Sequence, residues 1–334
     1  MTKLIIQIPC LNEASTLPAT LRDLPTQIAG IDRIEVLVID DGSTDDTADV
    51  ARSCGVDHVV RFRANKGLAA AFMAGLDAAL KLGADVIVNT DADNQYVGKD
   101  ISTLVQPILR LEADIVIGDR NVRTLRHMPR FKRWLQLFGS WVVRQVSNTR
   151  VPDTTSGFRA YSREAALRQT IVSEFSYTLE SIIQAGKKRM AIAHVPVATN
   201  ENTRDSRLFD SVFTYIKKSA ATIVRIYTMY EPLKVFTVTG GAVFLVGFLI
   251  SFRFLFLYVS GQGQGNVQSL ILSAVLMIVG FQVTLIGLVA DAIASNRRLT
   301  EELLFRLRSI ELAGLAKQPS ARDTVNEPIE IGKP

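Results

Sequence analysis

Short apolar runs alternate with helix-like stretches over the first two hundred residues. The runs are rich in β-branched residues and predict strands at KLIIQIP (3–9), IEVLVID (34–40), DHVVRF (57–62), ADVIVNT (84–90) and DIVIGD (114–119). Helical stretches lie between several of them, over 13–24, 45–54 and 67–82. This alternation predicts a Rossmann-like α/β fold, in which helices cover both faces of a mostly parallel sheet.

Two later apolar runs are much longer than any strand. Val235–Tyr258 and Ser269–Ala290 each exceed twenty residues, and a helix rising about 1.5 Å per residue crosses a hydrocarbon core of about 30 Å over that length. The loop SGQGQGN between them is uncharged, whereas basic residues flank the pair: Lys217, Lys218, Arg225, Lys234, Arg297, Arg298, Arg306 and Arg308. Because positive charge favours the cytoplasmic side, we expect a multi-pass protein of the cytoplasmic membrane with both termini in the cytoplasm.

The hydropathy pattern divides the chain into five segments. We expect a cytoplasmic globular domain over 1–207, a juxtamembrane amphipathic helix over 208–232 and a membrane region over 233–295. A second amphipathic helix over 296–316 is suited to pairing with a neighbouring subunit, and the polar tail 317–334 is expected to be disordered. The basic face of the first amphipathic helix favours the inner leaflet, although an ordinary helix packed on the globular domain is the alternative.

Composition supports the membrane region and narrows the partners. Hydrophobic residues make up 48% of the 334 residues and the mean hydropathy is +0.19, which is high for a wholly soluble protein. The net charge of +5 suits anionic lipid, but no basic stretch interleaved with aromatic residues supports nucleic-acid binding. Two cysteines without a metal or disulfide spacing indicate a reduced cytoplasmic setting.

Polar clusters follow the predicted strands. The clusters are PCLNE, DDGSTDDT, RANKG, DADNQ and GDR, in the order of the strands. In an open parallel sheet, ligands bind beyond the carboxyl ends of the strands, so we expect these clusters to converge on one edge. No G-x-G-x-x-G follows the first strand and no G-x-x-x-x-G-K-[ST] occurs, which argues against a dinucleotide-binding motif and a P-loop.

The cluster after the fourth strand has the composition of a cation site. Side chains alternate along an extended strand end, so Asp91, Asp93 and Gln95 form one row. Carboxylate and amide oxygens suit Mg²⁺ or Mn²⁺, and such an ion would let an acidic edge that includes Asp40 accept a diphosphate. Taken alone, a D-x-D is equally compatible with a helix cap.

The order of the motifs makes the resemblance specific. IPCLNEASTL, VLVIDDGSTDDT, NKGLAAAFMAG, TDADNQ, GDR, DTTSGFRAYSRE and TRDSRL occur in this order. Together they resemble the inverting nucleotide-sugar glycosyltransferases of family two, which have the GT-A fold. Within them the polyprenyl-phosphate glycosyltransferases are most similar, and the two apolar runs match their membrane-anchored members. The resemblance covers residues 3 to about 210.

The resemblance implies roles for individual residues on the donor side. The nucleoside pocket would be lined by Pro9, Leu11, Asn12 and Glu13, with Asp40 reaching the base or ribose and Lys66 and Gly67 beside them. The metal and diphosphate site would be formed by Asp91, Ala92, Asp93 and Gln95, with the metal held by Asp91, Asp93 and Gln95. Arg204, Ser206 and Arg207 match an R-x-S-K motif that closes over the donor phosphates, although Arg207 replaces the usual Lys.

On the acceptor side, Arg120 and Arg133 resemble the pair that holds the acceptor phosphate, with Arg130 and Lys132 as alternatives to Arg133. Asp153 matches the position of the catalytic carboxylate. A phosphate acceptor is already anionic near neutral pH, so Asp153 could position the arginines instead of acting as a base. A structural turn Asp after Pro152 is the plain alternative.

The resemblance implies a metal-dependent transfer of a hexose from a UDP-glucose or GDP-mannose type donor to undecaprenyl or dolichyl phosphate. Mg²⁺ or Mn²⁺ would be the cofactor, and membrane-anchored relatives suggest a homotetramer. One alternative is a membrane glycosyltransferase with a lipid hydroxyl or polysaccharide acceptor. Another is a membrane scaffold that keeps the fold without catalysis.

Overall fold

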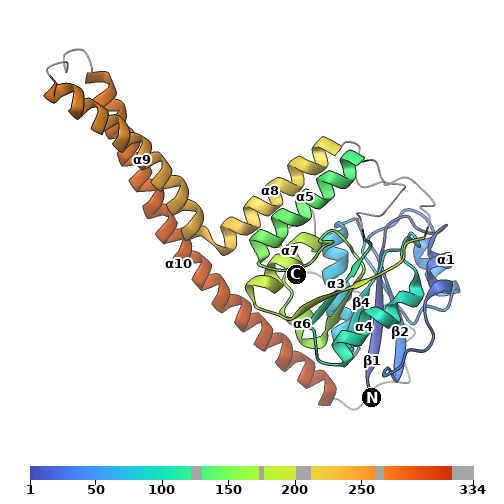
Figure 1. Ribbon diagram of the computed structural model, residues 1–334. Coiled ribbons are helices and arrows are strands. Elements are labelled where there is room, and N and C mark those ends of the chain that lie inside the picture. The colour runs from blue at the N-terminus through green and yellow to red at the C-terminus, as the bar shows by residue number, and fades with distance from the viewer. Residues whose placement is uncertain (122–129, 173–176, 201–211, 261–266, 318–334) are drawn as a thin grey trace. The chain divides into compact units, whose positions relative to one another are not determined.

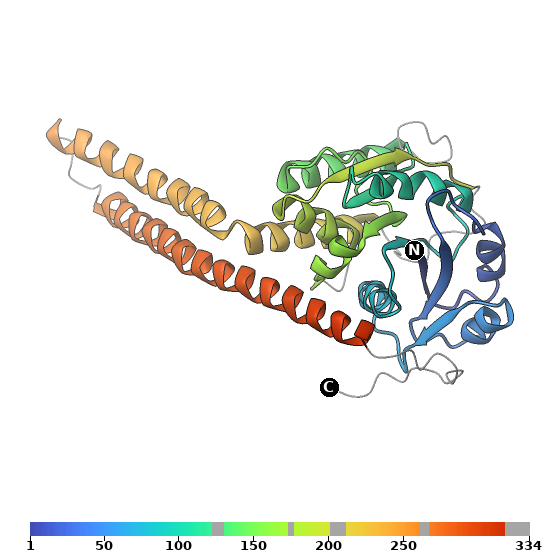
Figure 2. The same ribbon diagram turned by 90° about the horizontal axis from the view of Figure 1, so that it is seen from below.

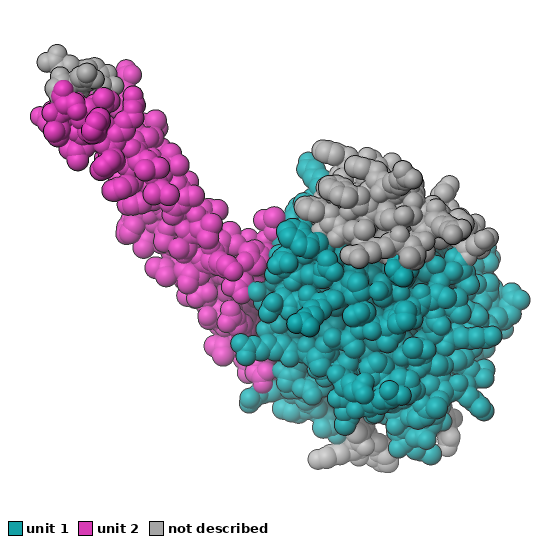
Figure 3. All heavy atoms as spheres, in the orientation of Figure 1, with its two compact units in different colours: residues 1–223, 304–334 teal, residues 224–303 magenta. Residues whose placement is uncertain are grey.

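The structure, a computed structural model, describes residues 1–121, 130–172, 177–200, 212–260 and 267–317. The chain divides into two units, residues 1–223 with 304–334 and residues 224–303, which Figure 3 shows in two colours. Each unit is described separately below. The predicted tail over 317–334 lies almost entirely outside the described residues.

The first unit contains a seven-stranded sheet in the order β3-β2-β1-β4-β6-β5-β7 (Figure 1). The strands are β1 Lys3–Cys10, β2 Arg33–Asp40, β3 His58–Arg61, β4 Val86–Asn89, β5 Ile115–Asp119, β6 Arg159–Ser162 and β7 Ile192–Pro196. Strands β1 to β4 pair in parallel, and β5 pairs in parallel with β7. Strand β6 runs antiparallel to both of its neighbours, β4 and β5. All five predicted strands are present, and the predicted mostly parallel sheet is confirmed.

Helices cover both faces of this sheet. They are α1 Leu17–Asp23, α2 Thr47–Ser53, α3 Leu68–Lys81, α4 Ile101–Leu109, α5 Arg130–Ser147, α6 Arg163–Arg168 and α7 Tyr177–Lys187, with a 3-10 turn over Gly98–Asp100. Alternate residues of β1 point to opposite faces. Ile6 belongs to a buried apolar cluster with Leu17 of α1 and Leu104 of α4, whereas Gln7 lies against Gly75 of α3 on the other face.

A buried ion cluster lies near the beginning of β1. The Glu35 side chain is 3% exposed and pairs with Lys3 Nζ at 2.7 Å and Arg33 Nε at 2.6 Å. His58 Nε2 lies 2.8 Å from the same carboxylate. Burial alone would raise the pKa of Glu35, but the hydrogen bonds from Lys3 and His58 and the surrounding positive charge hold it below its usual value. The cluster joins β1, β2 and β3 at the edge opposite their carboxyl ends.

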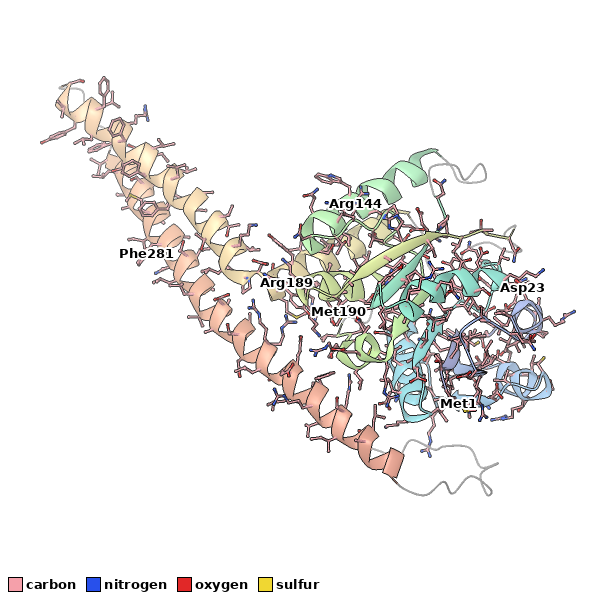
Figure 4. All side chains as sticks on the ribbon, turned by 60° about the horizontal axis from the view of Figure 1, so that its bottom comes forward. Met1, Asp23, Arg144, Arg189, Met190 and Phe281 are labelled. Carbon is pink, nitrogen blue, oxygen red and sulfur yellow. The ribbon has the colours of Figure 1, made fainter. Side chains whose placement is uncertain are left out.

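The second unit is built around a helical hairpin, α9 Pro232–Val259 and the part of α10 (Val267–Lys317) that lies within residues 224–303. Figures 1 and 2 show the two helices side by side. Both are long and apolar enough to cross a membrane, and each contains an 18-residue stretch with a mean hydropathy of 2.3. Large apolar side chains project from the hairpin, including Phe281, which is 58% exposed and labelled in Figure 4.

Glycines allow the two helices of this hairpin to approach closely. A Cβ added at Gly280 would lie 2.5 Å from the backbone nitrogen of Phe244 and 2.6 Å from the carbonyl oxygen of Gly240. A Cβ added at Gly247 would meet the carbonyl oxygen of Ser273 at 2.9 Å. Small residues at such positions let the backbones pack directly, as in many membrane helix pairs.

The sequence-based division between a second span and a separate amphipathic helix is not seen, because α10 is one continuous helix of 51 residues. The stretch 291–303 contains neither Gly nor Pro, so nothing in it breaks the helix. Within the first unit, Arg308 Nη1 donates to the carbonyl oxygens of Leu167 at 3.3 Å and Gln169 at 3.0 Å. The guanidinium of Arg168 lies 4.0 Å from the ring centre of Phe305. The end of α10 therefore packs on α6 of the same chain.

The first amphipathic helix is present as α8 Val212–Tyr230, whereas the residues just before it lie outside the described part of the chain. The predicted pairing of subunits stays a prediction.

Candidate active site

The carboxyl ends of the central strands meet at one edge of the sheet. The register pairs Cys10 at the end of β1 with Asp40 at the end of β2, and Gln7 of β1 with Asn89 at the end of β4. The loops that continue from these strands carry the polar clusters expected from the sequence. As a result, residues 11–13, 41–44 and 90–95 leave the sheet at the same edge.

The loops that follow β1, β2 and β3 are tied together by short hydrogen bonds. Asn12 accepts from the Thr44 backbone N–H at 2.9 Å, and its own N–H donates to Ser43 Oγ at 2.9 Å. The carboxylate of Asp41 accepts from the backbone N–H groups of Lys66 at 2.7 Å and Gly67 at 2.9 Å. The loops expected to form the nucleoside pocket are therefore held as one unit.

The residues predicted to line that pocket differ in their exposure. Leu11 is 39% exposed, whereas Glu13 is 8% exposed and Pro9 is buried in β1. Asp40 is fully buried, accepts from the Ser43 N–H at 2.8 Å and pairs with Arg61 Nε at 3.1 Å. In this structure its carboxylate organises the loop and faces no solvent, so contact with a base or ribose stays a prediction.

The paired carboxylates after β4 lie in a strongly acidic environment. Burial raises the pKa of Asp91 to about 7, and the negative charge of Asp93 adds to this rise, while the positive charge of Arg120 offsets only part of it. Asp93 Oδ1 accepts from the Gln95 N–H at 3.1 Å, which fixes the turn. A buried carboxylate with a second carboxylate nearby favours a bound cation.

Asp91 lies directly against the backbone of the loop before β6. A Cβ added at Gly157 would lie 3.1 Å from Asp91 Oδ1 and 2.9 Å from the hydroxyl oxygen of Tyr177. Gly157 thus lets the carboxylate approach the chain closely. Ala92, the next residue, is 4% exposed, and its carbonyl oxygen accepts from Thr20 Oγ1 at 2.9 Å. Among the residues that the structure describes, no group of three or more His, Cys, Asp or Glu side chains could hold a metal.

Arg120 and Asp153 form a two-point ion pair. Arg120 Nε donates to Asp153 Oδ2 at 2.7 Å and Nη2 donates to Oδ1 at 3.1 Å, with a further bond from Nη2 to Thr155 Oγ1 at 2.9 Å. The side chains of Arg120 and Asp153 are 12% and 1% exposed. Burial would raise the pKa of Asp153, but the charge and hydrogen bonds of Arg120, together with those of Thr155, hold it below its usual value. Asp153 is therefore a weak base in this arrangement.

A buried polar network lies beneath the edge and was not predicted from the sequence. Gln7 Nε2 donates to Asn89 Oδ1 at 2.9 Å, and Asn89 Nδ2 donates to the Gly157 carbonyl at 2.9 Å and to Tyr177 Oη at 3.0 Å. Gln7 and Asn89 are fully buried. One feature of the sequence could have indicated this network, because Gln7 and Asn89 each place an amide in an otherwise apolar strand.

Two further residues make contacts in the site region that were not predicted from the sequence. Tyr96 is 4% exposed and stacks on Phe158 with ring centres 4.8 Å apart, while its hydroxyl accepts from the Gly157 N–H at 3.2 Å. Asn200 donates from its side chain to the carbonyl oxygen of Asn94 at 2.9 Å. The chain just before residue 201 therefore runs beside the loop that carries Asp91.

Several predicted site residues lie outside the described part of the chain. Arg204, Ser206 and Arg207 are among them, and so are the side chains of Arg133 and its alternatives Arg130 and Lys132, although their backbone belongs to α5. The structure thus brings together Asp91, Asp93, Arg120 and Asp153 around the loop 153–157, with the Asn12, Asp41 and Lys66 loops along the same edge.

A mixed α/β sheet with polar loops after its central strands is a Rossmann-like class of fold, and comparisons with known proteins identify the family. A model of glycosyl transferase family 2 matches residues 5–168, and a model of the GtrB C-terminal hairpin matches residues 231–295. An uncharacterised protein of Methanocaldococcus jannaschii is 32% identical over 204 residues, which cover 59% of this chain and 81% of that protein. The chain belongs to glycosyltransferase family 2, and the resemblance inferred from the motifs is confirmed.

Two other proteins extend the comparison. The UDP-N-acetylglucosamine–dolichyl-phosphate N-acetylglucosaminyltransferase of Methanococcus voltae is 29% identical over 213 residues, covering 58% of this chain and 83% of that enzyme. The crystal structure of glucosyl-3-phosphoglycerate synthase from Mycobacterium tuberculosis with Mn²⁺, UDP-glucose and phosphoglyceric acid has a TM-score of 0.52 and 22% identity, covering 68% of this chain and 80% of that one. The latter confirms the GT-A-like fold.

Proposed function

We propose that this glycosyltransferase moves a hexose from a nucleoside-diphosphate sugar to a polyprenyl phosphate at the cytoplasmic face of a membrane. The relative from Methanococcus voltae, named for a dolichyl-phosphate acceptor, supports the acceptor class. The apolar hairpin and its family match support a membrane location. UDP-glucose or GDP-mannose type donors, undecaprenyl or dolichyl phosphate, and a homotetramer with cytoplasmic termini complete the proposal.

The observation that carries the acceptor class is the closed pair of Arg120 and Asp153. A hydroxyl acceptor must lose a proton during transfer, which calls for a base with a pKa near the working pH. Asp153 has a lowered pKa, and both of its oxygens are occupied by Arg120. A phosphate monoester is already ionised near neutral pH, with a second pKa of about 6, and needs no such base. The geometry therefore favours an anionic acceptor.

The same pair provides a site for the acceptor's charge. A guanidinium carries five N–H donors in a planar fork. Asp153 and Thr155 accept from Nε and Nη2, and within the described residues Nη1 makes no further hydrogen bond. In this proposal Asp153 fixes the plane of Arg120, and the outward part of the guanidinium contacts the acceptor phosphate. Arg133 is proposed as the second cation at that phosphate.

A divalent cation fits the donor set. Mg²⁺ and Mn²⁺ sites in nucleotide enzymes commonly use one or two carboxylates together with substrate phosphates, so Asp91 and Asp93 suffice, with Gln95 beside them. Burial raises the pKa of Asp91 to about 7, and the negative charges of Asp93 and Glu13 add to the rise, so a bound cation would stabilise the ionised carboxylate. When bound, the ion would stabilise the charge that grows on the leaving nucleoside diphosphate. Arg204 and Arg207 are proposed to assist there.

The transfer step itself is an attack by the acceptor phosphate on the anomeric carbon of the donor. An acceptor phosphate oxygen held at Arg120 attacks the anomeric carbon as the bond to the diphosphate breaks. Attack in line with the leaving group inverts the anomeric centre, so an α-linked donor gives a β-linked product. The nucleoside end of the donor would lie along the Asn12, Asp41 and Lys66 loops, which are tied together by the contacts described above.

The test is a transfer assay with full-length protein in lipid nanodiscs. Undecaprenyl or dolichyl phosphate, Mn²⁺ or Mg²⁺ and a panel of UDP- and GDP-sugars are incubated with the protein, and glycolipids are identified by mass spectrometry. The matched control is the free polyprenol of the same chain length, which differs only in the phosphate. A product from the phosphate alone supports the proposal. A product from the polyprenol or from diacylglycerol, or none with any donor, refutes it.

A further inference from the structure

Arg159, the first residue of β6, is a fully buried cation within the motif DTTSGFRAYSRE, and the family resemblance gave it no role of its own. Its guanidinium donates to four acceptors. These are the carbonyl oxygens of Ser156 at 2.7 Å, Thr154 at 2.9 Å and Thr178 at 2.9 Å, and the hydroxyl of Ser181 at 2.6 Å. All four are neutral groups, which is an unusual environment for a buried charge.

Two of these acceptors lie on either side of Thr155. Nε holds the carbonyl of residue 156 and Nη2 holds the carbonyl of residue 154, so the guanidinium spans the loop and fixes the backbone of the residue between them. The hydroxyl of Thr155 accepts from Arg120 Nη2 at 2.9 Å and donates to Asp153 Oδ1 at 3.0 Å. The position of the Arg120–Asp153 pair is thus linked to Arg159 through one short loop.

The same loop also supports the donor side. Gly157, one residue after Ser156, presents its backbone to the carboxylate of Asp91, and its N–H donates to Tyr96 Oη at 3.2 Å. A shift of the loop would therefore move the Gly157 backbone that contacts Asp91, as well as the Arg120–Asp153 pair. Catalytic geometry is sensitive to such shifts, because a displacement of about 1 Å can cost about a hundredfold in rate.

The chemistry of the contact calls for arginine and not merely for a positive charge. Arginine presents its N–H groups from three nitrogens in one rigid plane, whereas lysine has a single nitrogen on a flexible stem. One ammonium group cannot take the place of both Nε at Ser156 and Nη2 at Thr154 while also reaching α7 through Nη1. A lysine at this position would keep the positive charge but could not make both hydrogen bonds to the loop.

We propose that Arg159 is a positioning residue for the transfer reaction, acting through the loop 153–157 on both the acceptor arginine and the metal-binding carboxylate. It touches neither substrate. This inference rests on the proposed function, because its readout is the transfer rate. Its other contacts, to Thr178 and Ser181 of α7, anchor it in the core.

The test compares R159K and R159Q with S181A in the nanodisc assay. Ser181→Ala removes a contact of the same guanidinium on the side away from the loop and serves as the matched control. We expect R159K to lower kcat about thirtyfold, to change the donor KM less than threefold and to leave thermal unfolding within a few degrees of wild type. S181A should lower the unfolding temperature similarly and keep kcat within twofold of wild type.

A double variant tests whether the effect passes through Thr155. In a T155A background the contact to Arg120 is already lost and only the effect on Asp91 remains, so R159K should lower kcat by about sixfold instead of about thirtyfold. Full multiplication of the two single effects, an unchanged kcat in folded R159K, or a loss of kcat in S181A that matches R159K would overturn the proposal. Failure of both Arg159 variants to fold would show a purely structural role and would also overturn it. Absence of transfer in the wild type would instead refute the proposed function.

Discussion

Replacing Asp153 by Asn tests the acceptor side most directly. The change keeps the shape of the side chain but replaces one acceptor oxygen by an NH₂ group, which then faces an N–H of Arg120. One of the two bonds, at 2.7 Å or 3.1 Å, is lost. A hydrogen bond to a charged group contributes about 1.5–3 kcal/mol. At about 1.4 kcal/mol per factor of ten, we expect kcat to fall about 10- to 100-fold.

The pH dependence of kcat separates positioning from base catalysis. A carboxylate with a lowered pKa is ionised throughout the range from pH 5 to 9, so Asp153 itself contributes no change of rate in that window. The acidic limb of the wild-type profile should instead follow the acceptor phosphate, whose second pKa is about 6. D153N should therefore show a lower profile of the same shape, measured with polyprenyl phosphate and saturating donor.

The matched control for this variant is Thr155→Ala. It removes a neutral acceptor of the same guanidinium and leaves both carboxylate oxygens in place. A neutral hydrogen bond contributes about 1 kcal/mol, so we expect about a fivefold loss of kcat. The positioning argument is wrong if D153N abolishes turnover and the acidic limb disappears with it, while T155A stays near wild type. Thermal unfolding of both variants shows whether either has lost its fold.

Three further predictions concern other parts of the molecule. Gly157→Ala places a Cβ 3.1 Å from Asp91 Oδ1, and a Mn²⁺ titration of the transfer rate should show a several-fold higher half-activating concentration. Glu35→Gln should lower the free energy of unfolding by about 1.5–3 kcal/mol at pH 7. The pKa of Glu35 is lowered in the folded protein, so its ionised form stabilises the fold above the ordinary Glu pKa of about 4.3. Thermal scans should therefore show the difference from wild type above this pH and lose it as the pH falls further. Gly280→Leu should destabilise the detergent-solubilised protein, whereas Gly241→Leu, with no atom within 4 Å of its Cβ, should not.

The sheet could be predicted largely from the sequence because its central strands are buried on both faces. Strands β1, β2 and β4 contain short apolar runs rich in Ile and Val, and short runs of this composition favour buried strands. Strands β6 and β7 were not predicted. RAYS begins with a charged residue, and the burial of β7 is mixed, so neither shows the apolar pattern. Their place in the sheet depends on pairing with distant strands.

The parts of the site that depend on short sequence motifs and on the ends of strands could be predicted. The strand-end rule and the motif order selected the acidic loop after β4 and the loops beside it, and the structure has these at one edge. The pairing of Arg120 with Asp153 joins residues 33 positions apart, and the bond from Asn89 to Tyr177 joins residues 88 apart. Contacts of that range depend on how α7 and the loop before β6 pack, which no local pattern encodes.

The buried polar residues beneath the edge of the sheet lower its stability but support the site. Gln7 and Asn89 occupy neighbouring central strands, where apolar side chains would avoid the cost of burying an amide. Exchanging Asn89 for Leu would remove that cost, but it would leave the Gly157 carbonyl and the Tyr177 hydroxyl without their donor. Gly157 itself lies against the carboxylate of Asp91 and the hydroxyl of Tyr177. The loop 153–157 is thus held from below by Asn89 at one end and by Arg159 in its middle. An apolar residue at position 89 would pack well in the core, but it would no longer hold the loop through Gly157. We infer that an amide is present in the middle of the sheet because it fixes the loop against which Asp91 lies.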